Sequence, residues 1–231
     1  MDTISGSTTT FTNMSWDDRS GWSDNSLQIQ GLGTTAVINY CPIPASYNLE
    51  RLGKTIEIEF IPVKSNSDGD VLIRIGDNAA GHIDIKPTGA YLYLGVNEII
   101  HTNYKVGERI KLAFVFNTSN GTDLYANNLV YIINNGILER AKEFGLAVSY
   151  GSDNGNITIG GSESIVRVFT IRAYDKALTY QQELNNYIFD SLDKSTIISR
   201  NQLFENGQLD EGLVGNKIDT ILIEGLPGES E

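Results

Sequence analysis

Two glutamates, Glu57 and Glu59, stand two residues apart in the segment TIEIEFIP at 55–62. Side chains with this spacing share one face of a β-strand. Two carboxylates about 5–5.5 Å apart can serve as the nucleophile and the acid/base of glycoside hydrolysis. However, the alternation of these acids with apolar residues is enough to predict a half-buried strand whose acidic side chains face water.

Tyrosines supply aromatic faces on which sugar rings can stack. Tyr91 and Tyr93 both belong to the segment AYLYL at 90–94, and Tyr104 lies close to a loop. We predict these three tyrosines as ligand-binding residues, with Tyr91 and Tyr93 on the same face of a strand. The alternative is that Tyr91 and Tyr93 only pack against cross-strand neighbours, as tyrosines in sheets commonly do.

Acidic and amide side chains gather in the predicted loops, where their oxygens could bind a hard cation such as Ca²⁺. The tightest acidic turn is SDGD at 67–70, so Asp68 and Asp70 are the candidate metal ligands. Turn formation alone explains the same residues. Further oxygen donors occur at 77–78, 123–127 and 153–156, and no segment has the EF-hand pattern.

Few other groups could support catalysis. The chain contains two histidines, His82 and His101, and one cysteine, Cys41. It has no G-x-S-x-G motif, and no basic residue adjoins Cys41 to lower the pKa of its thiol. We therefore predict structural roles for both histidines and no enzymatic activity.

The charge pattern excludes two classes of partner. The formal net charge is −12, and the 17 basic residues are scattered without a cluster. Binding to nucleic acid or to an anionic membrane surface needs local positive potential, so neither is expected. Membrane insertion is not expected either, because no apolar run approaches the roughly 18 residues of a membrane span.

Ten segments have the length and apolar pattern of strands. They are 27–30, 35–40, 55–62, 70–75, 82–85, 90–94, 109–117, 129–134, 156–159 and 165–174. Asn-Gly pairs at 120–121, 135–136 and 154–155 mark hairpins between them. The pattern predicts an all-β fold, a two-sheet antiparallel β-sandwich. Trp16 and Trp22 would anchor the N-terminal segment, in the core or over a sheet edge.

A short helix is predicted near 180–190. Thr179 can cap it, Gln182 stands where the partner of a capping box belongs, and Leu184 and Ile188 recur at helical spacing. Beyond Asp190 the periodicity is weak. We therefore expect a sandwich domain over 1–190, followed at 191–231 by a tail or linker, or by the start of a further module.

The segment SIVRVFTIRAYDKALTYQQELNNYIFD at 164–190 resembles the end of concanavalin A-like sandwiches of the laminin-G/pentraxin type. There, a final core strand is followed by a turn and a short helix. Tyr131, Asn134, Asn135 and Gly136 match a laminin-G strand that ends in Y-x-N-G. The resemblance covers about 15–190 and implies a concanavalin A-like jelly roll. It also implies Ca²⁺ at a sheet rim, although this fold hosts lectins, glycosidases and inert spacers alike.

The β-glucanases of this fold carry the motif E-x-D-x-x-E or E-x-D-x-E. Here Glu59 occupies the position of the aspartate, and the third acid is missing. Without that acid the leaving group has no proton donor. A glycoside hydrolase is therefore the disfavoured alternative.

The segments ISRNQLFENGQLD at 198–210 and KIDTILIEGLP at 217–227 resemble parts of modular virion proteins of tailed bacteriophages, especially crAss-like gut phages. This resemblance implies a non-catalytic carbohydrate-recognition or adhesin module of a tail fibre or receptor-binding protein. The module would lie on the surface of the phage particle, with host surface glycan and other virion proteins as its partners. The alternative is a structural spacer, or a capsid or tail decoration module, without a ligand.

Overall fold

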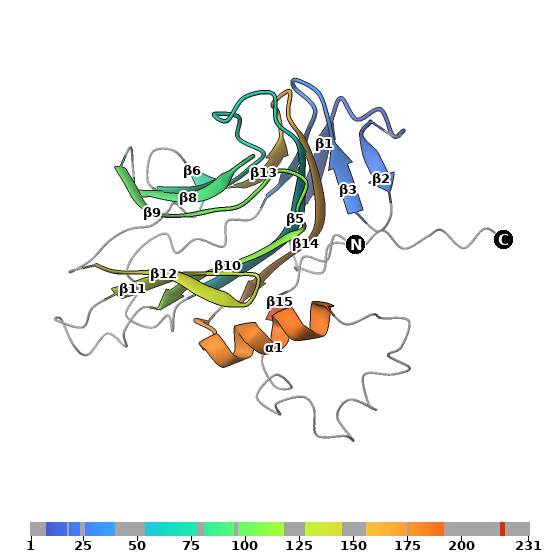
Figure 1. Ribbon diagram of the computed structural model, residues 1–231. Coiled ribbons are helices and arrows are strands. Elements are labelled where there is room, and N and C mark those ends of the chain that lie inside the picture. Colours follow the sequence, from blue (N-terminus) through green and yellow to red (C-terminus); the bar gives the residue numbers. More distant parts are fainter. Residues whose placement is uncertain are drawn as a thin grey trace, which may run out of the picture.

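The chain folds as two antiparallel sheets packed face to face (Figure 1). The structure is a computed structural model that describes residues 8–17, 19–23, 26–39, 54–77, 81–94, 97–117, 128–144, 156–174, 176–191 and 218–219. The first sheet has the order β1 (Thr9–Thr12), β4 (Thr35–Ile38), β13 (Asn156–Gly160), β6 (Ile73–Asp77), β7 (Gly81–Lys86), β8 (Gly89–Leu94) and β9 (Asn97–Asn103).

The second sheet has the order β12 (Ile137–Phe144), β11 (Asn128–Asn134), β10 (Ile110–Asn117), β5 (Lys54–Lys64), β14 (Ile165–Tyr174), β3 (Ser26–Ile29) and β2 (Gly21–Ser23). The short β15 (Ile218–Asp219) also pairs with β14. The predicted two-sheet sandwich is confirmed. The division of the chain at residue 190 stays a prediction.

The core lies between the two sheets, and every second side chain of each strand points into it. On β5, Ile56, Ile58 and Phe60 are fully buried and face Phe114, Leu112 and Ile110 of β10 across the strand pair. Burial of each large aliphatic or aromatic side chain contributes about 1.5–3 kcal/mol. The apolar side chains whose alternation identified these strands therefore also provide the main stabilisation of the fold through their burial.

Each of the ten predicted segments coincides with a strand of the structure, with boundaries that differ by a few residues. The largest difference is at 70–72, which precede β6 instead of belonging to it. Five further strands were not predicted: the short β15, and β1, β2, β9 and β12, which are the outermost strands of the two sheets.

The hairpin between β11 and β12 turns at Asn135 and Gly136, as the Asn-Gly signal predicts. Both residues have positive φ, 49° and 78°, which a two-residue hairpin turn of this kind requires. A Cβ atom on Gly136 would lie 2.7 Å from Cδ1 of Tyr187, so glycine is also needed for this close contact. The other two Asn-Gly pairs lie outside the described residues.

The helix α1 (Tyr180–Ser191) lies on the outer face of the second sheet, the face turned away from the core (Figure 1). Its capping box is confirmed. The backbone N–H of Gln182 donates to Thr179 Oγ1 at 3.3 Å, and the backbone N–H of Thr179 donates to Gln182 Oε1 at 2.9 Å. No helix in the described part of the chain is long and apolar enough to cross a membrane.

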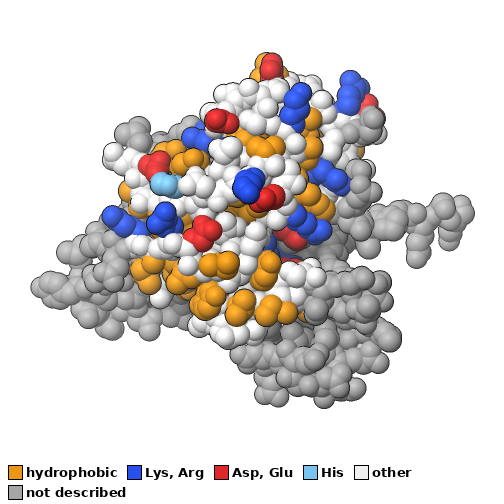
Figure 2. All heavy atoms as spheres, in the orientation of Figure 1, with side chains coloured by type: hydrophobic (Ala, Val, Ile, Leu, Met, Phe, Trp, Pro, Cys, Tyr) orange, Lys and Arg blue, Asp and Glu red, His pale blue; other side chains and the backbone are white. Residues whose placement is uncertain are grey.

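Several large apolar side chains are exposed. Trp16 and Trp22 are both exposed, so the core alternative was wrong for them; Trp22 lies on the edge strand β2, and Trp16 packs edge-to-face against Phe11. A second group gathers over β12 and α1 (Figure 2) and consists of Ile137, Leu138, Tyr180 and Ile188.

Candidate functional site

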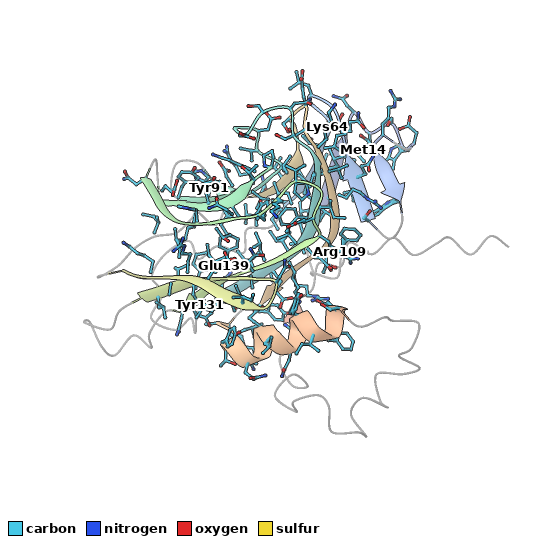
Figure 3. All side chains as sticks on the ribbon, viewed as in Figure 1. Met14, Lys64, Tyr91, Arg109, Tyr131 and Glu139 are labelled. Atoms are coloured by element: carbon cyan, nitrogen blue, oxygen red, sulfur yellow. The ribbon has the colours of Figure 1, made fainter. Side chains whose placement is uncertain are left out.

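The outer face of the first sheet, which points away from the second sheet, carries a row of polar and aromatic side chains. Asp84, Tyr91 and His101 are register partners on β7, β8 and β9. Their chain neighbours Ile83, Ile85 and Leu92 are core residues. Because successive side chains of a strand alternate between faces, the row must lie on the outer face. Figure 3 marks the position of Tyr91 on β8.

Four rings form a nearly continuous aromatic strip across β7, β8 and β9. His82 stacks on Tyr93 with centroids 4.8 Å apart and planes 14° apart. Tyr93 and Tyr91 are 6.3 Å apart at 27°, and Tyr91 and His101 are 5.6 Å apart at 29°. The structure thus brings the predicted Tyr91 and Tyr93 together on one face. Near-parallel rings hold one another in place, and the edges of the half-buried tyrosine rings face outward, whereas His82 is buried.

A lysine ammonium lies over the two tyrosines. Lys86 Nζ is 4.8 Å from the ring centroid of Tyr91 and 5.6 Å from that of Tyr93. It also donates to the Tyr93 hydroxyl at 3.3 Å. These distances suit cation–π attraction, and the ammonium adds a hydrogen-bond donor to the aromatic strip.

An ion pair fixes a guanidinium beside the strip. Arg74 on β6 makes two hydrogen bonds to the buried carboxylate of Asp84, at 2.7 and 2.8 Å. Hydrogen bonds to Asp84 raise the pKa of Arg74. A bidentate pair holds both groups in one orientation, and the remaining N–H groups of Arg74 can donate to a ligand hydroxyl.

Tyr104 does not join this surface. Its ring packs edge-to-face on Phe60 of the core at 5.4 Å, and its hydroxyl donates to the Lys86 carbonyl at 2.8 Å. Burial raises the pKa of Tyr104 well above its usual value. Tyr104 therefore contacts the strand that carries Lys86 from the core side. A direct contact of Tyr104 with a ligand stays a prediction.

Both predicted metal ligands lie in the loop between β5 and β6. Asp70 accepts a hydrogen bond from Ser164 Oγ at 2.5 Å, which ties the 65–71 loop to the start of β14, and Asp68 is exposed. Among the described residues, no three histidine, cysteine or acidic side chains gather as a metal site would need. Calcium requires six to eight oxygen ligands. The calcium site at Asp68 and Asp70 gains no support here and stays a prediction.

Asp70 instead borders a hollow of about 680 Å³. Its walls come from the 66–71 loop, the 160–163 loop and Leu32, and its floor includes Arg74 and Thr158. Sequence analysis did not identify this hollow, because three separate segments form it. The alternation in GHIDIK at 81–86, by contrast, could have placed His82, Asp84 and Lys86 on one face.

Glu57 and Glu59 lie on the outer face of the second sheet. Glu59 forms an ion pair with Arg109 at 2.7 Å. The prediction that Glu57 faces water was wrong, because α1 covers Glu57 and leaves 1% of it exposed. Glu57 has no route to a polysaccharide, so the glucanase alternative loses its candidate nucleophile.

A buried ionic cluster joins α1 to the second sheet. Arg172 of β14 donates to Glu57 Oε2 at 3.0 Å and to both carboxylate oxygens of Asp190 at 2.6 and 2.8 Å. Lys111 of β10 donates to Asp190 at 2.5 Å, and the Asn186 amide donates to Glu57 at 2.6 Å. The helix face toward the sheet is therefore polar, whereas Ile188 of the predicted apolar face is 48% exposed.

Charges within the cluster are balanced. Burial alone would raise the pKa of Glu57, but the charges of Lys111 and Arg172 outweigh this effect and keep it below the usual value. Burial also favours the neutral form of Asp190, yet the hydrogen bonds and charge of Arg172 hold its pKa low. Burial, reinforced by the charge of Glu57, raises the pKa of Glu183. Two carboxylates thus balance two cations, while the raised pKa of Glu183 favours its protonated form, which hydrogen-bonds to Glu57.

The protonated Glu183 predicts a specific pH dependence of stability. Its pKa is higher in the folded chain than in the unfolded chain, so folding retains a proton there. The resulting stability is complete below pH about 4.5 and is lost as the pH rises toward the folded pKa. Replacing Glu183 with glutamine removes this loss. Relative to wild type, the free energy of unfolding of E183Q should therefore increase by up to about 1.4 kcal/mol for each pH unit above pH 4.5.

Urea unfolding at several pH values between 5 and 8 measures this gain. The exposed Glu108 provides the control substitution E108Q, since it contacts only the exposed Lys105 among the described residues. If the free energies of unfolding of E183Q and wild type ran parallel over the whole range, Glu183 would not be protonated in the fold.

Comparisons with known proteins agree with the fold. No protein-family model and no curated protein matches the sequence. Solved structures that resemble it include the botulinum neurotoxin type G receptor binding domain, with 9% identity, a TM-score of 0.51, and coverage of 81% of this chain and 45% of that one. The botulinum neurotoxin serotype D binding domain has 10% identity and a TM-score of 0.54, with coverage of 80% of this chain and 46% of that one. The receptor binding domain of the mosaic serotype C/D has 10% identity and a TM-score of 0.57, with coverage of 79% and 46% of the two chains.

The chain thus spans about half the length of these structures. At such low identities the likeness shows the sandwich fold alone. The concanavalin A-like jelly roll and the phage origin are finer assignments that rest on the sequence resemblances.

Proposed function

We propose that this chain is a non-catalytic carbohydrate-recognition module that binds through the outer face of its first sheet. The aromatic strip of His82, Tyr93, Tyr91 and His101 carries this proposal. Because the rings stack on one another, the half-buried Tyr91 and Tyr93 offer their ring edges and hydroxyls to sugars, and the buried His82 backs Tyr93. The neighbouring Lys86 and Arg74 offer charged donors to sugar hydroxyls, and the buried Asp84 holds Arg74 in place.

The similar solved structures support a binding role by analogy, because they are named receptor binding domains. A biological setting follows from the sequence resemblance to phage proteins. In that setting the module is part of a tail fibre or receptor-binding protein on the virion surface, where it attaches to host surface glycan beside other virion proteins. Each contact would be weak, and multiple copies on one particle would supply avidity.

A glycan array tests the proposal. The chain should be displayed as multiple copies on a bead or a multimeric carrier, since avidity makes weak binding detectable. We expect a limited set of host-surface glycans to be bound. Binding to no glycan at all would contradict the proposal.

A second candidate function is that of a spacer or decoration module, and one observation favours it. The exposed group Ile137, Leu138, Tyr180 and Ile188 forms an apolar area over β12 and α1, as an assembly contact would (Figure 2). An array without binding, together with self-association that L138D abolishes in analytical ultracentrifugation, would favour this function.

A further inference from the structure

The hollow beside Asp70 has the size and position of a second subsite on the same face. Its volume of about 680 Å³ lies within the range of small-molecule sites in proteins, about 300–1,000 Å³. Gly160 and Gly161 form part of its lining. A Cβ atom on Gly160 would lie 2.3 Å from Ile29 Cγ2 and 2.5 Å from the Thr34 carbonyl oxygen, so only glycine lets the backbone lie so deep here.

The lining combines polar groups with an apolar rim. Asp70 contributes its carboxylate, and Thr158 lies at the base. Ser162 Oγ is buried and has no hydrogen-bond partner within the described part of the chain. Leu32 is 74% exposed at the rim. A buried hydroxyl without a partner is costly, and rotation of the Ser162 side chain would let a ligand hydroxyl satisfy it.

The hollow is continuous with the aromatic strip through direct strand register. Thr158 of β13 faces Arg74 of β6, Arg74 faces Asp84 of β7, and Asp84 faces Tyr91 of β8. Neighbouring strands lie about 4.8 Å apart, so Thr158 and Tyr91 are separated by about 14 Å. Arg74 belongs both to the hollow and to the ion pair beside the strip.

We propose that the hollow and the Tyr91–Tyr93 pair are two subsites for one oligosaccharide, which runs across the strands from β13 to β8. The inference rests on the proposed carbohydrate function and names its ligand class: an extended chain of several sugars instead of a terminal monosaccharide. The hollow end takes a neutral, hydroxyl-rich sugar. Asp70 and Glu163 line it, and the one guanidinium present, that of Arg74, is already paired with Asp84.

Calorimetric titration with a length series of an array-positive glycan tests the inference. Affinity should rise with chain length until both subsites are occupied. T158W fills the base of the hollow and should lower the affinity for the long oligosaccharide about tenfold, to that of its short fragment. The affinity for a short fragment that occupies only the tyrosine subsite should not change.

The control variant is T10W. Thr10 lies on the same outer-face row, where it pairs with Val37, the other register partner of Thr158. This variant adds the same bulk two strands away and should bind like wild type. L32D offers a second test at an exposed position that tolerates substitution, and it should also weaken only the long ligand.

Two negative outcomes are distinguishable. Affinity that is independent of length, together with wild-type binding by T158W and L32D, would overturn the two-subsite inference and leave the tyrosine surface intact. Failure of every glycan to bind would overturn the proposed function and this inference with it.

Discussion

Replacing Arg172 with methionine should lower the free energy of unfolding by about 3–5 kcal/mol. Arg172 contacts Glu57 of the sheet and Asp190 of α1, and all three are largely buried. Removing the guanidinium leaves two buried carboxylates with Lys111 as their remaining cation. Equilibrium unfolding in urea measures the loss, and the α1 signal in far-ultraviolet circular dichroism should be lost before the β-sheet signal.

The chain contains a matched control for this substitution. Arg109 also pairs with a glutamate of β5, Glu59, but its side chain is 54% exposed. Exposed ion pairs contribute about 0–1 kcal/mol. The contact of Arg109 with the Phe169 ring, at 4.0 Å, adds about 0.5–1 kcal/mol. Equal losses for R172M and R109M would show that the buried cluster does not hold α1 on the sheet.

The double substitution Y91A/Y93A should abolish detectable glycan binding without unfolding the chain. Tyrosines at the centre of binding surfaces can each contribute about 2 kcal/mol, which is about thirty-fold in affinity. Both side chains lie on the outer face, so their removal leaves the core intact. Calorimetry with an array-positive glycan measures the affinity, and the thermal unfolding midpoint verifies the fold.

Y180A is the control for the loss of a tyrosine. Tyr180 is exposed, but it lies on α1, against the second sheet. Its replacement should leave glycan affinity at the wild-type value. Undiminished binding by Y91A/Y93A would remove the aromatic strip from the proposed function, whereas equal losses in both variants would indicate a general effect on the fold.

The sequence predicted the strands that lie inside the sheets and missed those at the edges. An inner strand such as β5 buries Ile56, Ile58 and Phe60 between neighbours on both sides, so its alternation is strong. An edge strand has a partner on one side only and meets water along the other. In β12, with the sequence ILERAKEF, charged residues occupy half of the positions, as expected of an edge that must not pair with other chains.

The buried ionic cluster could not be predicted from local pattern. The alternation of side chains along the strand placed Glu57 on its outer face. Whether that face meets water depends on α1, which follows more than a hundred residues later. The helix pattern was also misleading. Leu184 and Ile188 indicated an apolar face, whereas Glu183, Asn186 and Asp190 contact the sheet, because Lys111 and Arg172 supply matching charges there.

The candidate site was predictable in part. The spacing of Tyr91 and Tyr93 was sufficient to place both on one face. Their stacking with His82 and His101 depends on the register of β7, β8 and β9, which the sequence does not specify. Tyr104 was chosen for its nearness to a loop, but that criterion carries no information on which way a ring points.

An NMR titration of the isotope-labelled chain with its best array ligand locates the binding surface without any substitution. We expect the largest amide shifts on β7, β8 and β9, around Tyr91, Tyr93 and His101. Largest shifts on α1 or β12, with β7 to β9 unchanged, would contradict it.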